Sequence, residues 1–160
     1  MKFTRLEQRV MRDEGFRGTS YKDTVDIWTV GYGSTRLFGV PVKETTICTT
    51  EQARAQLRAD LYQAIIDCEK LFDTWETLDS IRQEILVNMC YNLGSVGLSN
   101  FRNMRSAIRH QEWKRAAEEM VDSKWYSQVG GRGQRLVAAM KSGKWIEDLN
   151  GRPASERPEV

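Results

Sequence analysis

The sequence lacks several features that would place it quickly in a class. No apolar run approaches the roughly 20 residues that a membrane helix needs, and the opening stretch MKFTRLEQRVM carries charges instead of the apolar core of a secretory signal. The net charge is only +2, from 24 Lys and Arg against 22 Asp and Glu. A field that weak does not indicate a nucleic-acid partner. We therefore expect no membrane span, no nucleic-acid partner and synthesis in the cytoplasm.

Cysteine and histidine are also scarce. The three cysteines, Cys48, Cys68 and Cys90, are odd in number and form no C-x-x-C pair. This usage suits free thiols in a reducing compartment and disfavours a disulfide framework. His110 is the single histidine and has no Cys, Asp or Glu at ligand spacing, so nothing supports a metal site. We expect neither a metal nor a cofactor.

Glycine is unevenly distributed along the chain. Five glycines fall between residues 15 and 39, and the next is Gly94. The early segment therefore needs turns, whereas the stretch after it can sustain helix. Residues 27–30, Ile-Trp-Thr-Val, are β-branched and aromatic and are bounded by glycines, so they predict a strand. Residues 18–33 as a whole are typical of small hairpins.

Helical spacing accounts for the remaining apolar residues. Phe3, Leu6 and Val10 lie on one face of a first helix that should end near residues 13–15. Thr49 and Gln52 form a capping box for a second helix. Its apolar stripe consists of Ala53, Leu57, Leu61, Ile65, Cys68 and Phe72.

The second half of the chain predicts further helices. By the same capping logic a helix starts over residues 80–83, and residues 85–91 are apolar nearly all round, as expected for a central buried helix. Residues 92–97 predict a loop, and shorter helices follow at about 99–110, 112–122 and 132–142. The last ten residues are polar and contain proline, which predicts disorder.

These elements predict an α+β protein with one domain over residues 1–148. A small sheet lobe spans about 13–48, a bridging helix about 50–72 and a helical lobe about 73–148, to which the helix over 2–12 is added. Residues 149–160 form a polar tail.

Two carboxylates in the early segment raise the question of chemistry. Glu14 stands at the end of the first helix, Asp23 follows a short strand, and Thr29 lies on the next strand. A glycosidase needs one protonated carboxyl to protonate the leaving oxygen and one carboxylate to activate water or attack the sugar. A threonine hydroxyl can orient that water. Spacing alone leaves the alternative open that these are a solvated helix end, a turn residue and an ordinary strand residue.

Other residues also have two interpretations. Trp113, Trp125 and Trp145 stand at helical spacing, which favours core positions over sugar-stacking platforms. Trp28 and Tyr32 are better placed to face a substrate. Two further features favour structure over chemistry: Asn88 in an apolar helix needs hydrogen-bond partners, and the glycine-rich residues 130–133 lack the spacing of a phosphate loop.

Short motifs extend over the whole chain. The early segment contains E-G-F-R at 14–17, Y-K-D-T at 21–24 and T-V-G-Y-G at 29–33. These resemble the E-G-x-R, Y-x-D-x and T-x-G-x-G motifs of the phage-type lysozymes, the muramidases of the T-even bacteriophage kind. The resemblance covers about residues 3–148 and continues through Leu78-Asp79, Asn88, Asn92-Leu93-Gly94, Gly97, Phe101, Ser123-Lys124-Trp125-Tyr126, Gln128, Arg132, Arg135, Gly143 and Trp145.

The resemblance implies a two-lobed lysozyme-like fold and a specific reaction. That reaction is hydrolysis of the β-1,4 bond between N-acetylmuramic acid and N-acetylglucosamine in peptidoglycan. Glu14 would be the general acid, and Asp23 with Thr29 would hold the attacking water. Such enzymes are similar to inverting hydrolases, so the two carboxyl groups should stand roughly 6.5–9.5 Å apart.

The resemblance also implies supporting residues. Arg132 matches an arginine that lies beside the catalytic glutamate in the family. Ser34 stands where several relatives have histidine, so an ion pair that some of them form there is absent. The sugar-contacting positions would be Thr35, Tyr91, Asn92, Met104 and Glu119, of which Met104 and Glu119 depart from the small or amide residues typical of those places.

As a biological role, the resemblance favours a monomeric endolysin. Because the sequence shows no secretory signal, such a protein would accumulate in the host cytoplasm and reach the periplasmic cell wall after a membrane-pore protein acts. A tail-associated lysozyme and a secreted toxin are alternative uses of the same domain. Two alternatives differ in chemistry: a lytic transglycosylase, which needs only one acid, and a non-catalytic wall-binding module on a lysozyme scaffold.

Overall fold

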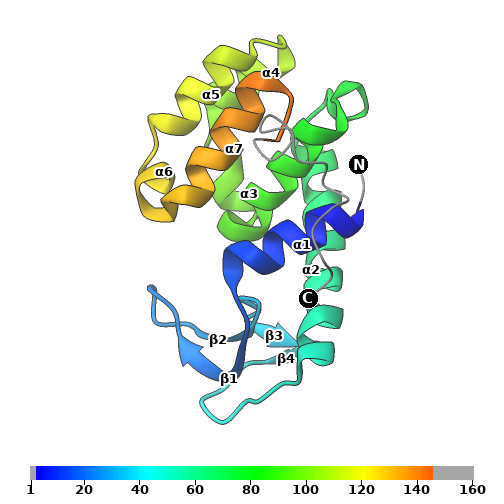
Figure 1. The fold of residues 1–160 in the computed structure, drawn as a ribbon, viewed down its shortest axis with the longest axis vertical. Helices are drawn as coiled ribbons and strands as arrows, with labels where there is room; N and C mark the ends of the chain where they lie inside the picture. The colour runs from blue at the N-terminus through cyan, green and yellow to red at the C-terminus, as the bar shows by residue number, and fades with distance from the viewer. Residues whose placement is uncertain (1–2, 146–160) are drawn as a thin grey trace. The chain divides into compact units, whose positions relative to one another are not determined.

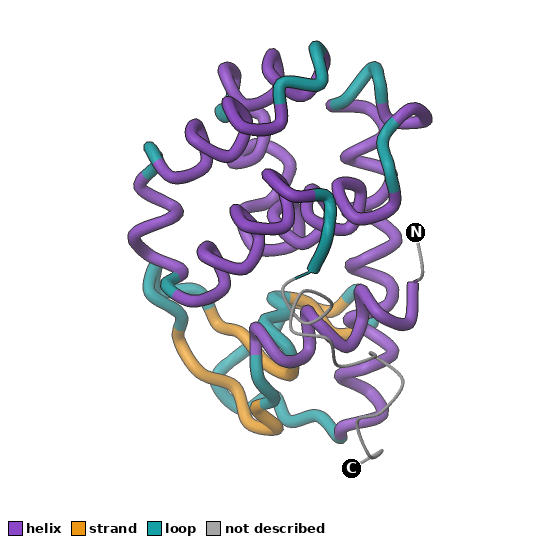
Figure 2. Tube along the Cα trace, turned by 45° about the horizontal axis from the view of Figure 1, so that its top comes forward, coloured by secondary structure: helices purple, strands orange, loops and turns teal. Residues whose placement is uncertain are grey.

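A computed structural model describes residues 3–145 of the chain. Within this range the chain forms two compact units, residues 3–66 and residues 67–145 (Figure 1). The first unit contains all of the described strands, and the second contains helices (Figure 2). The α+β class predicted from the sequence is confirmed. The first unit also contains the first helix, which the sequence analysis grouped with the helical lobe.

The first unit, called the sheet unit below, consists of six elements. They are α1 (Phe3–Glu14), β1 (Arg17–Lys22), β2 (Trp28–Gly31), β3 (Arg36–Leu37), β4 (Val40–Pro41) and the first part of α2 (Thr50–Leu71). β1 and β2 pair antiparallel, with Tyr21 opposite Thr29. β3 and β4 form a second, very short antiparallel pair. The predicted strand is thus found one residue later than expected.

The two helices of the sheet unit begin and end as the sequence predicts. Leu6 and Val10 on α1 are fully buried, and the helix stops before Gly15, whose φ of +70° suits glycine. At the start of α2, Gln52 Oε1 accepts from the backbone N–H of Thr49 at 2.9 Å, and Thr49 Oγ1 accepts from that of Gln52 at 3.1 Å. The predicted capping box is confirmed.

A buried carboxylate joins α1 to α2 inside the sheet unit. Glu7 is 1% exposed and accepts hydrogen bonds from Arg54 Nε at 2.5 Å and from Arg58 Nε at 3.1 Å. Each oxygen of Glu7 therefore has a cationic donor, which offsets the cost of burying its charge. These bonds fix α1 against the early turns of α2.

The second unit, called the helical unit below, contains the end of α2 and six further elements. They are η1 (Trp75–Thr77), α3 (Ser80–Ser99), α4 (Arg102–Arg109), α5 (Trp113–Val121), α6 (Lys124–Val129) and α7 (Gly131–Ser142). α5 packs against α4 and α7, and α7 packs against α3 and α6 (Figures 1 and 2). Residues 84–90 of α3 are all buried, as expected of a central helix.

The structure corrects two predictions in α3. The predicted loop over residues 92–97 is reduced to a kink at Gly94, whose φ of 74° and ψ of 163° are not helical, and α3 consists of two helical stretches joined at this kink. The residue that caps α3 is Asp79, one position before the predicted start. Its carboxylate accepts from the N–H groups of Ile81 and Arg82 at 3.1 and 3.0 Å. The predicted disorder of the last ten residues lies outside the described range.

The glycine-rich residues 130–133 join two helices. Gly130 takes a positive φ of 54° between α6 and α7. A Cβ on Gly133 would lie 2.9 Å from Tyr126 Cδ2 and 3.0 Å from Val129 Cγ2. Gly133 therefore allows close packing of α6 on α7, and this segment serves structure, as the sequence indicates.

Candidate active site

Glu14 is the last residue of α1 and is half-buried. The turn over residues 31–34 packs directly on its carboxylate. A Cβ on Gly33 would lie only 3.2 Å from Glu14 Oε2, and Gly33 has a φ of +88°. Because only glycine combines that backbone conformation with that close approach, the turn covers one side of the Glu14 carboxylate without a side chain between them.

Asp23 follows β1 and organises the turn after it. Its Oδ1 accepts from the backbone N–H groups of Val25 and Ile27, both at 2.9 Å. The Asp23 N–H donates to the carbonyl of Ile27 at 3.0 Å. These bonds hold the side chain in a defined orientation. Oδ2 of Asp23 has no hydrogen-bond partner among residues 3–145, so this oxygen can bind a water.

Thr29 lies on β2 opposite Tyr21 and is 3% exposed. Its Oγ1 donates to the carbonyl of Ile27 at 3.1 Å. With its proton engaged, the hydroxyl can only accept a hydrogen bond from a neighbouring molecule. Thr29 and Asp23 thus bind the same residue. The Thr29 hydroxyl donates to the Ile27 carbonyl, and the Asp23 carboxylate accepts from the Ile27 amide.

The charges of both carboxylates act on Tyr21. Burial raises the pKa of its phenol, the negative charge of Glu14 raises it further, Arg17 lowers it, and Asp23 raises it. The Arg17 guanidinium lies 4.1 Å from the centre of the Tyr21 ring. Tyr21 lies opposite Thr29 on the paired strands and stands two residues before Asp23, so it lies beside both of these candidate residues. The Y-x-D motif contains this tyrosine, but no role for it was predicted from the sequence.

A second residue that the sequence analysis missed is Asp60 on α2. Ser34 Oγ donates to Asp60 Oδ2 at 2.8 Å. At Ser34 the resemblance implies that an ion pair is absent. In its place, the neutral Ser34 hydroxyl donates a hydrogen bond to the Asp60 carboxylate. The two residues are far apart in the sequence, and neither belongs to a periodic pattern, so no local signal pairs them.

Of the predicted sugar-binding residues, Thr35 belongs to the sheet unit. It is exposed, and its carbonyl accepts from the Val42 N–H at 2.9 Å. It directly follows Ser34, so its backbone is held on both sides.

The other predicted sugar-binding residues belong to the helical unit. Tyr91 and Glu119 are half-buried, and Asn92 is exposed, with its Oδ1 accepting from Trp125 Nε1 at 2.9 Å. Met104 is fully buried at 0% exposure, so its side chain contributes to the core and has no surface for a sugar.

Arg132 and Asn88 form a buried pair in the helical unit. Arg132 Nε donates to Asn88 Oδ1 at 2.8 Å, and its Nη2 donates to the Asn88 carbonyl at 3.2 Å. Both residues are at least nine-tenths buried. The structure thus supplies the partner that Asn88 was predicted to need.

The aromatic residues divide between core and surface. Trp125 and Trp145 are buried, which agrees with the predicted core positions. Tyr32 is also buried, against the expectation that it faces a substrate, and its ring lies 5.6 Å from that of Phe16. Trp28 is half-buried, with Lys22 Nζ 5.5 Å from its ring centre.

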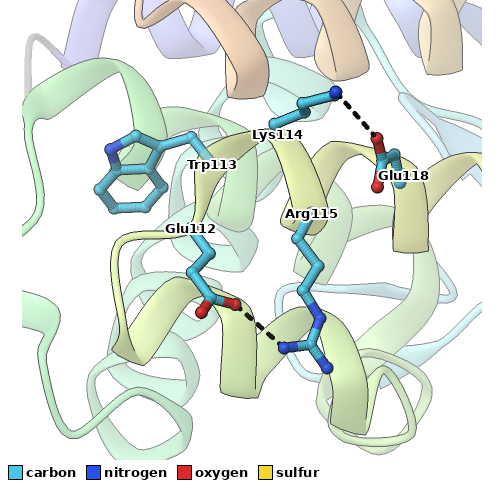
Figure 3. A pocket seen from close by; sticks show the side chains of 5 residues that line it. All are labelled: Glu112, Trp113, Lys114, Arg115 and Glu118. Carbon is cyan, nitrogen blue, oxygen red and sulfur yellow. Dashed lines mark hydrogen bonds and ion pairs between the residues drawn. The ribbon is translucent and has the colours of Figure 1, made fainter.

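A shallow surface pocket of about 410 Å³ lies at the start of α5 (Figure 3). Its lining charges are paired within it, Arg115 with Glu112 at 3.0 Å and Lys114 with Glu118 at 4.0 Å. The Trp113 indole completes the lining and points away from both ion pairs (Figure 3). Since these charges satisfy each other at the surface, nothing in this pocket calls for a charged ligand.

Two classes of site are not represented in the described part of the chain. Among residues 3–145, no group of three His, Cys, Asp or Glu side chains is placed to hold a metal ion. In the same range, no helix combines the length and the apolar character that a bilayer crossing requires.

Comparison with known proteins identifies the family of the chain. The chain matches the phage lysozyme family over residues 11–142. It is 28% identical to "Probable T4-type lysozyme 1" of Dictyostelium discoideum, over 86% of this chain and 94% of that protein. It is 26% identical to the pre-baseplate central spike protein Gp5 of Enterobacteria phage T4, over 86% of this chain but 28% of that protein.

A third relative is the peptidoglycan hydrolase gp36 of Pseudomonas phage phiKMV. The identity is 28% over 79% of this chain and 14% of that protein. The family match spans most of the chain and includes Asp23 and Thr29, together with Glu14 at the end of α1. The chain belongs to the phage lysozyme family and is a glycoside hydrolase of the muramidase class that acts on peptidoglycan.

Proposed function

We propose that this protein hydrolyses the β-1,4 bond between N-acetylmuramic acid and N-acetylglucosamine, with Glu14 as general acid and Asp23 and Thr29 holding the water. The observation that carries the proposal is the placement of Glu14 at the end of α1, with Gly33 packed on its carboxylate, in the same unit as Asp23 and Thr29, which both bind Ile27. A glycosidase needs two carboxyl groups with different environments near one bond. Glu14 is packed against a turn, whereas Asp23 accepts two backbone hydrogen bonds.

The proposed reaction inverts the anomeric carbon in a single displacement. Glu14 gives its proton to the glycosidic oxygen as the bond from that oxygen to the anomeric carbon breaks. Water attacks the same carbon from the opposite face, and Asp23 Oδ2 takes up the water's proton. Thr29 Oγ1 accepts the water's other hydrogen, since its own proton is engaged by Ile27. The separation of roughly 6.5–9.5 Å between the two carboxyl groups stays a prediction.

The sheet unit also offers one candidate sugar contact. Thr35 is exposed and its backbone is fixed, so its hydroxyl is available to a glycan strand. Tyr91, Asn92 and Glu119 stay predicted contacts, and Arg132 stays a predicted supporting residue. We leave Met104 out of the proposal because it is fully buried.

The test is clearance of a peptidoglycan suspension by Glu14→Gln beside the unmodified protein. The glutamine amide cannot donate a proton of suitable acidity, so we expect the rate to fall by at least about 100-fold. Glu44→Gln makes the same chemical change at an exposed position of the sheet unit and should keep the wild-type rate. Unchanged clearance by Glu14→Gln would remove Glu14 from the proposed role.

Mass spectrometry of the released fragments separates the competing chemistries. Hydrolysis adds one water per cleaved bond and leaves reducing N-acetylmuramic acid ends. A lytic transglycosylase would leave anhydro ends without added water, and a wall-binding module would release no fragments. Anhydro ends would overturn the hydrolytic role of Asp23 and Thr29 while leaving Glu14 as the acid.

We further propose that the protein is a monomeric endolysin that depends on a membrane-pore protein for release. Cytoplasmic expression should lyse the host only when a pore-forming protein is expressed with it. Similarity to a central spike protein supports the alternative of a tail-associated enzyme. Recovery of the chain in purified virions instead of free in the lysate would favour that alternative.

A further inference from the structure

We propose that Asp60 is a positioning residue for the general acid, acting through Ser34 and the turn over residues 31–34. The inference rests on the proposed function, because it assigns Asp60 a task in the chemistry of Glu14. Asp60 does not touch the reacting atoms in this proposal. It fixes the piece of backbone that covers the Glu14 carboxylate.

The turn over residues 31–34 is a closed unit. Val30 N–H donates to the Ser34 carbonyl at 3.0 Å, and Ser34 N–H donates back to the Val30 carbonyl at 3.0 Å. Gly33 lies inside this ring of hydrogen bonds, with the position of its missing Cβ 3.2 Å from Glu14 Oε2. Because both ends of the turn are tied together, a displacement of Ser34 also displaces Gly33 relative to the carboxylate.

Asp60 holds this turn from α2. Ser34 is 4% exposed, and its hydroxyl donates to Asp60 Oδ2 at 2.8 Å. Gln56, one helical turn earlier, donates from Nε2 to Asp60 Oδ1 at 2.8 Å. The Oε1 of Gln56 accepts from the Phe38 N–H at 2.7 Å. The pair on α2 therefore holds both ends of residues 34–38, the segment that contains the candidate sugar contact Thr35.

The helix that bears Glu14 is held by the same part of α2. Glu7 on α1 accepts from Arg54 and Arg58, which alternate along α2 with Gln56 and Asp60. Residues 54–60 of α2 thus fix both α1 and the turn that packs on its final residue. This shared support is what a positioning role requires, because the acid and its cover cannot move independently while both sets of bonds are intact.

The hydrogen bonds to Asp60 predict a loss of function when its carboxylate is removed. Both partners of Asp60 are donors, so removal of its carboxylate leaves a nearly buried hydroxyl and a nearly buried amide without their acceptor. The turn then gains freedom, and water gains access to the side of Glu14 that Gly33 covers. Misplacement of a catalytic group by about 1 Å can lower a rate by about 100-fold.

The experiment measures kcat, KM and the pH–rate profile on solubilised peptidoglycan fragments for Ser34→Ala and Asp60→Ala. We expect kcat to fall about 10-fold with KM within about twofold, by analogy with misplaced catalytic groups. We also expect the alkaline limb of the profile, where the general acid loses its proton, to move to lower pH, because hydration favours the charged carboxylate.

Two further variants make the result specific. Asp60→Asn can accept from Gln56 and donate to the Ser34 hydroxyl, so it should restore most of the rate and the wild-type profile. Ser20→Ala deletes a hydroxyl that donates to the Glu44 carbonyl at 2.6 Å in the same unit. It loses one hydrogen bond away from the turn over residues 31–34 and should leave the pH–rate profile unchanged.

The outcomes separate this inference from the proposed function. If Ser34→Ala and Asp60→Ala keep both kcat and the wild-type profile while Glu14→Gln is inactive, the positioning role fails and the general acid stands. A profile that moves equally in Ser20→Ala would also overturn it, because the effect would then reflect lost stability alone. If Glu14→Gln retains full activity, the proposed function itself fails.

Discussion

The two units of this protein are held together differently. Of the twelve largest fully buried side chains among the described residues, three lie in the sheet unit and nine in the helical unit. Both units bury hydrogen-bonded polar side chains, Glu7, Ser34 and Gln56 in the sheet unit and Asn88 and Arg132 in the helical unit, so the difference between the units lies in the number of large apolar side chains. Directional bonds fix positions more narrowly than apolar contacts do. The proposed acid, base and water-binding residues therefore lie in the unit where hydrogen bonds, more than bulk burial, set the geometry.

The largest expected loss of stability comes from removing a buried apolar side chain of the helical unit. Leu86→Ala removes a fully buried side chain from the central helix α3. A truncation of this kind costs about 2–5 kcal/mol in the free energy of unfolding. Chemical denaturation should show it, and Val96→Ala, at a 76% exposed position of the same helix, should stay within about 0.5 kcal/mol of wild type. Equal losses in the two variants would mean that α3 is not the centre of the core.

An intermediate loss of stability is expected from changing a buried polar side chain of the sheet unit. Glu7→Gln removes the charge that Arg54 and Arg58 share, and its amide can satisfy only one of them as an acceptor. Because the two arginines are about half exposed, solvent moderates the loss, which we place at about 1–2 kcal/mol in the free energy of unfolding, measured by chemical denaturation.

The matched control for this prediction is in the helical unit. Glu112→Gln removes a partner of Arg115 in an exposed ion pair of 3.0 Å. Such pairs contribute little, so the free energy of unfolding should change by less than about 0.5 kcal/mol. If the two variants lose the same free energy of unfolding, the burial of Glu7 adds nothing to the strength of its ion pairs.

The smallest expected effect concerns pH. Burial raises the pKa of the Asp60 carboxyl above its ordinary value of 3.8, although its hydrogen bonds with Ser34 and Gln56 lower it in part. The folded protein then holds this proton more tightly than the unfolded chain does. The contribution of Asp60 to stability is therefore fully present below pH 3.8 and falls as pH rises through the raised pKa.

Asp60→Asn lacks this titration. We expect its unfolding free energy relative to wild type to increase from about pH 3.5 to about pH 7, measured by urea denaturation at matched ionic strength. Asp26→Asn, at an exposed position of the sheet unit, provides the comparison. A difference between Asp60→Asn and wild type that does not change with pH would contradict the direction of the shift.

Local sequence signals predicted much of the fold. The apolar face of α1, the capping box of Thr49 and Gln52 and the buried residues of α3 each depend on side chains a few positions apart. The motif around Glu14, Asp23 and Thr29 likewise lies in one short segment, so its local structure follows from its glycines and strand formers. Such short-range features are visible in a sequence because their physical cause is short-range.

The errors arose where distant contacts override local preference. Asn92, Gly94 and Ser95 favour a loop by propensity, yet the chain leaves helical geometry only at Gly94, where α3 is kinked. The short helix α6 was missed because its six residues carry too little periodicity to recognise. The bond from Ser34 to Asp60 could not be predicted, since only the folded chain brings the turn after β2 to the middle of α2.

The close contact at Gly133 offers a position where a mutation should make the folding of the helical unit sensitive to temperature. Even a methyl group there would press on Tyr126 and Val129, at a cost of about 1–3 kcal/mol for overpacking. A Gly133→Ala allele should therefore be permissive at low growth temperature and restrictive at high temperature. Temperature shifts would then lower or restore the peptidoglycan-hydrolysing activity of this variant while every proposed catalytic side chain stays wild type.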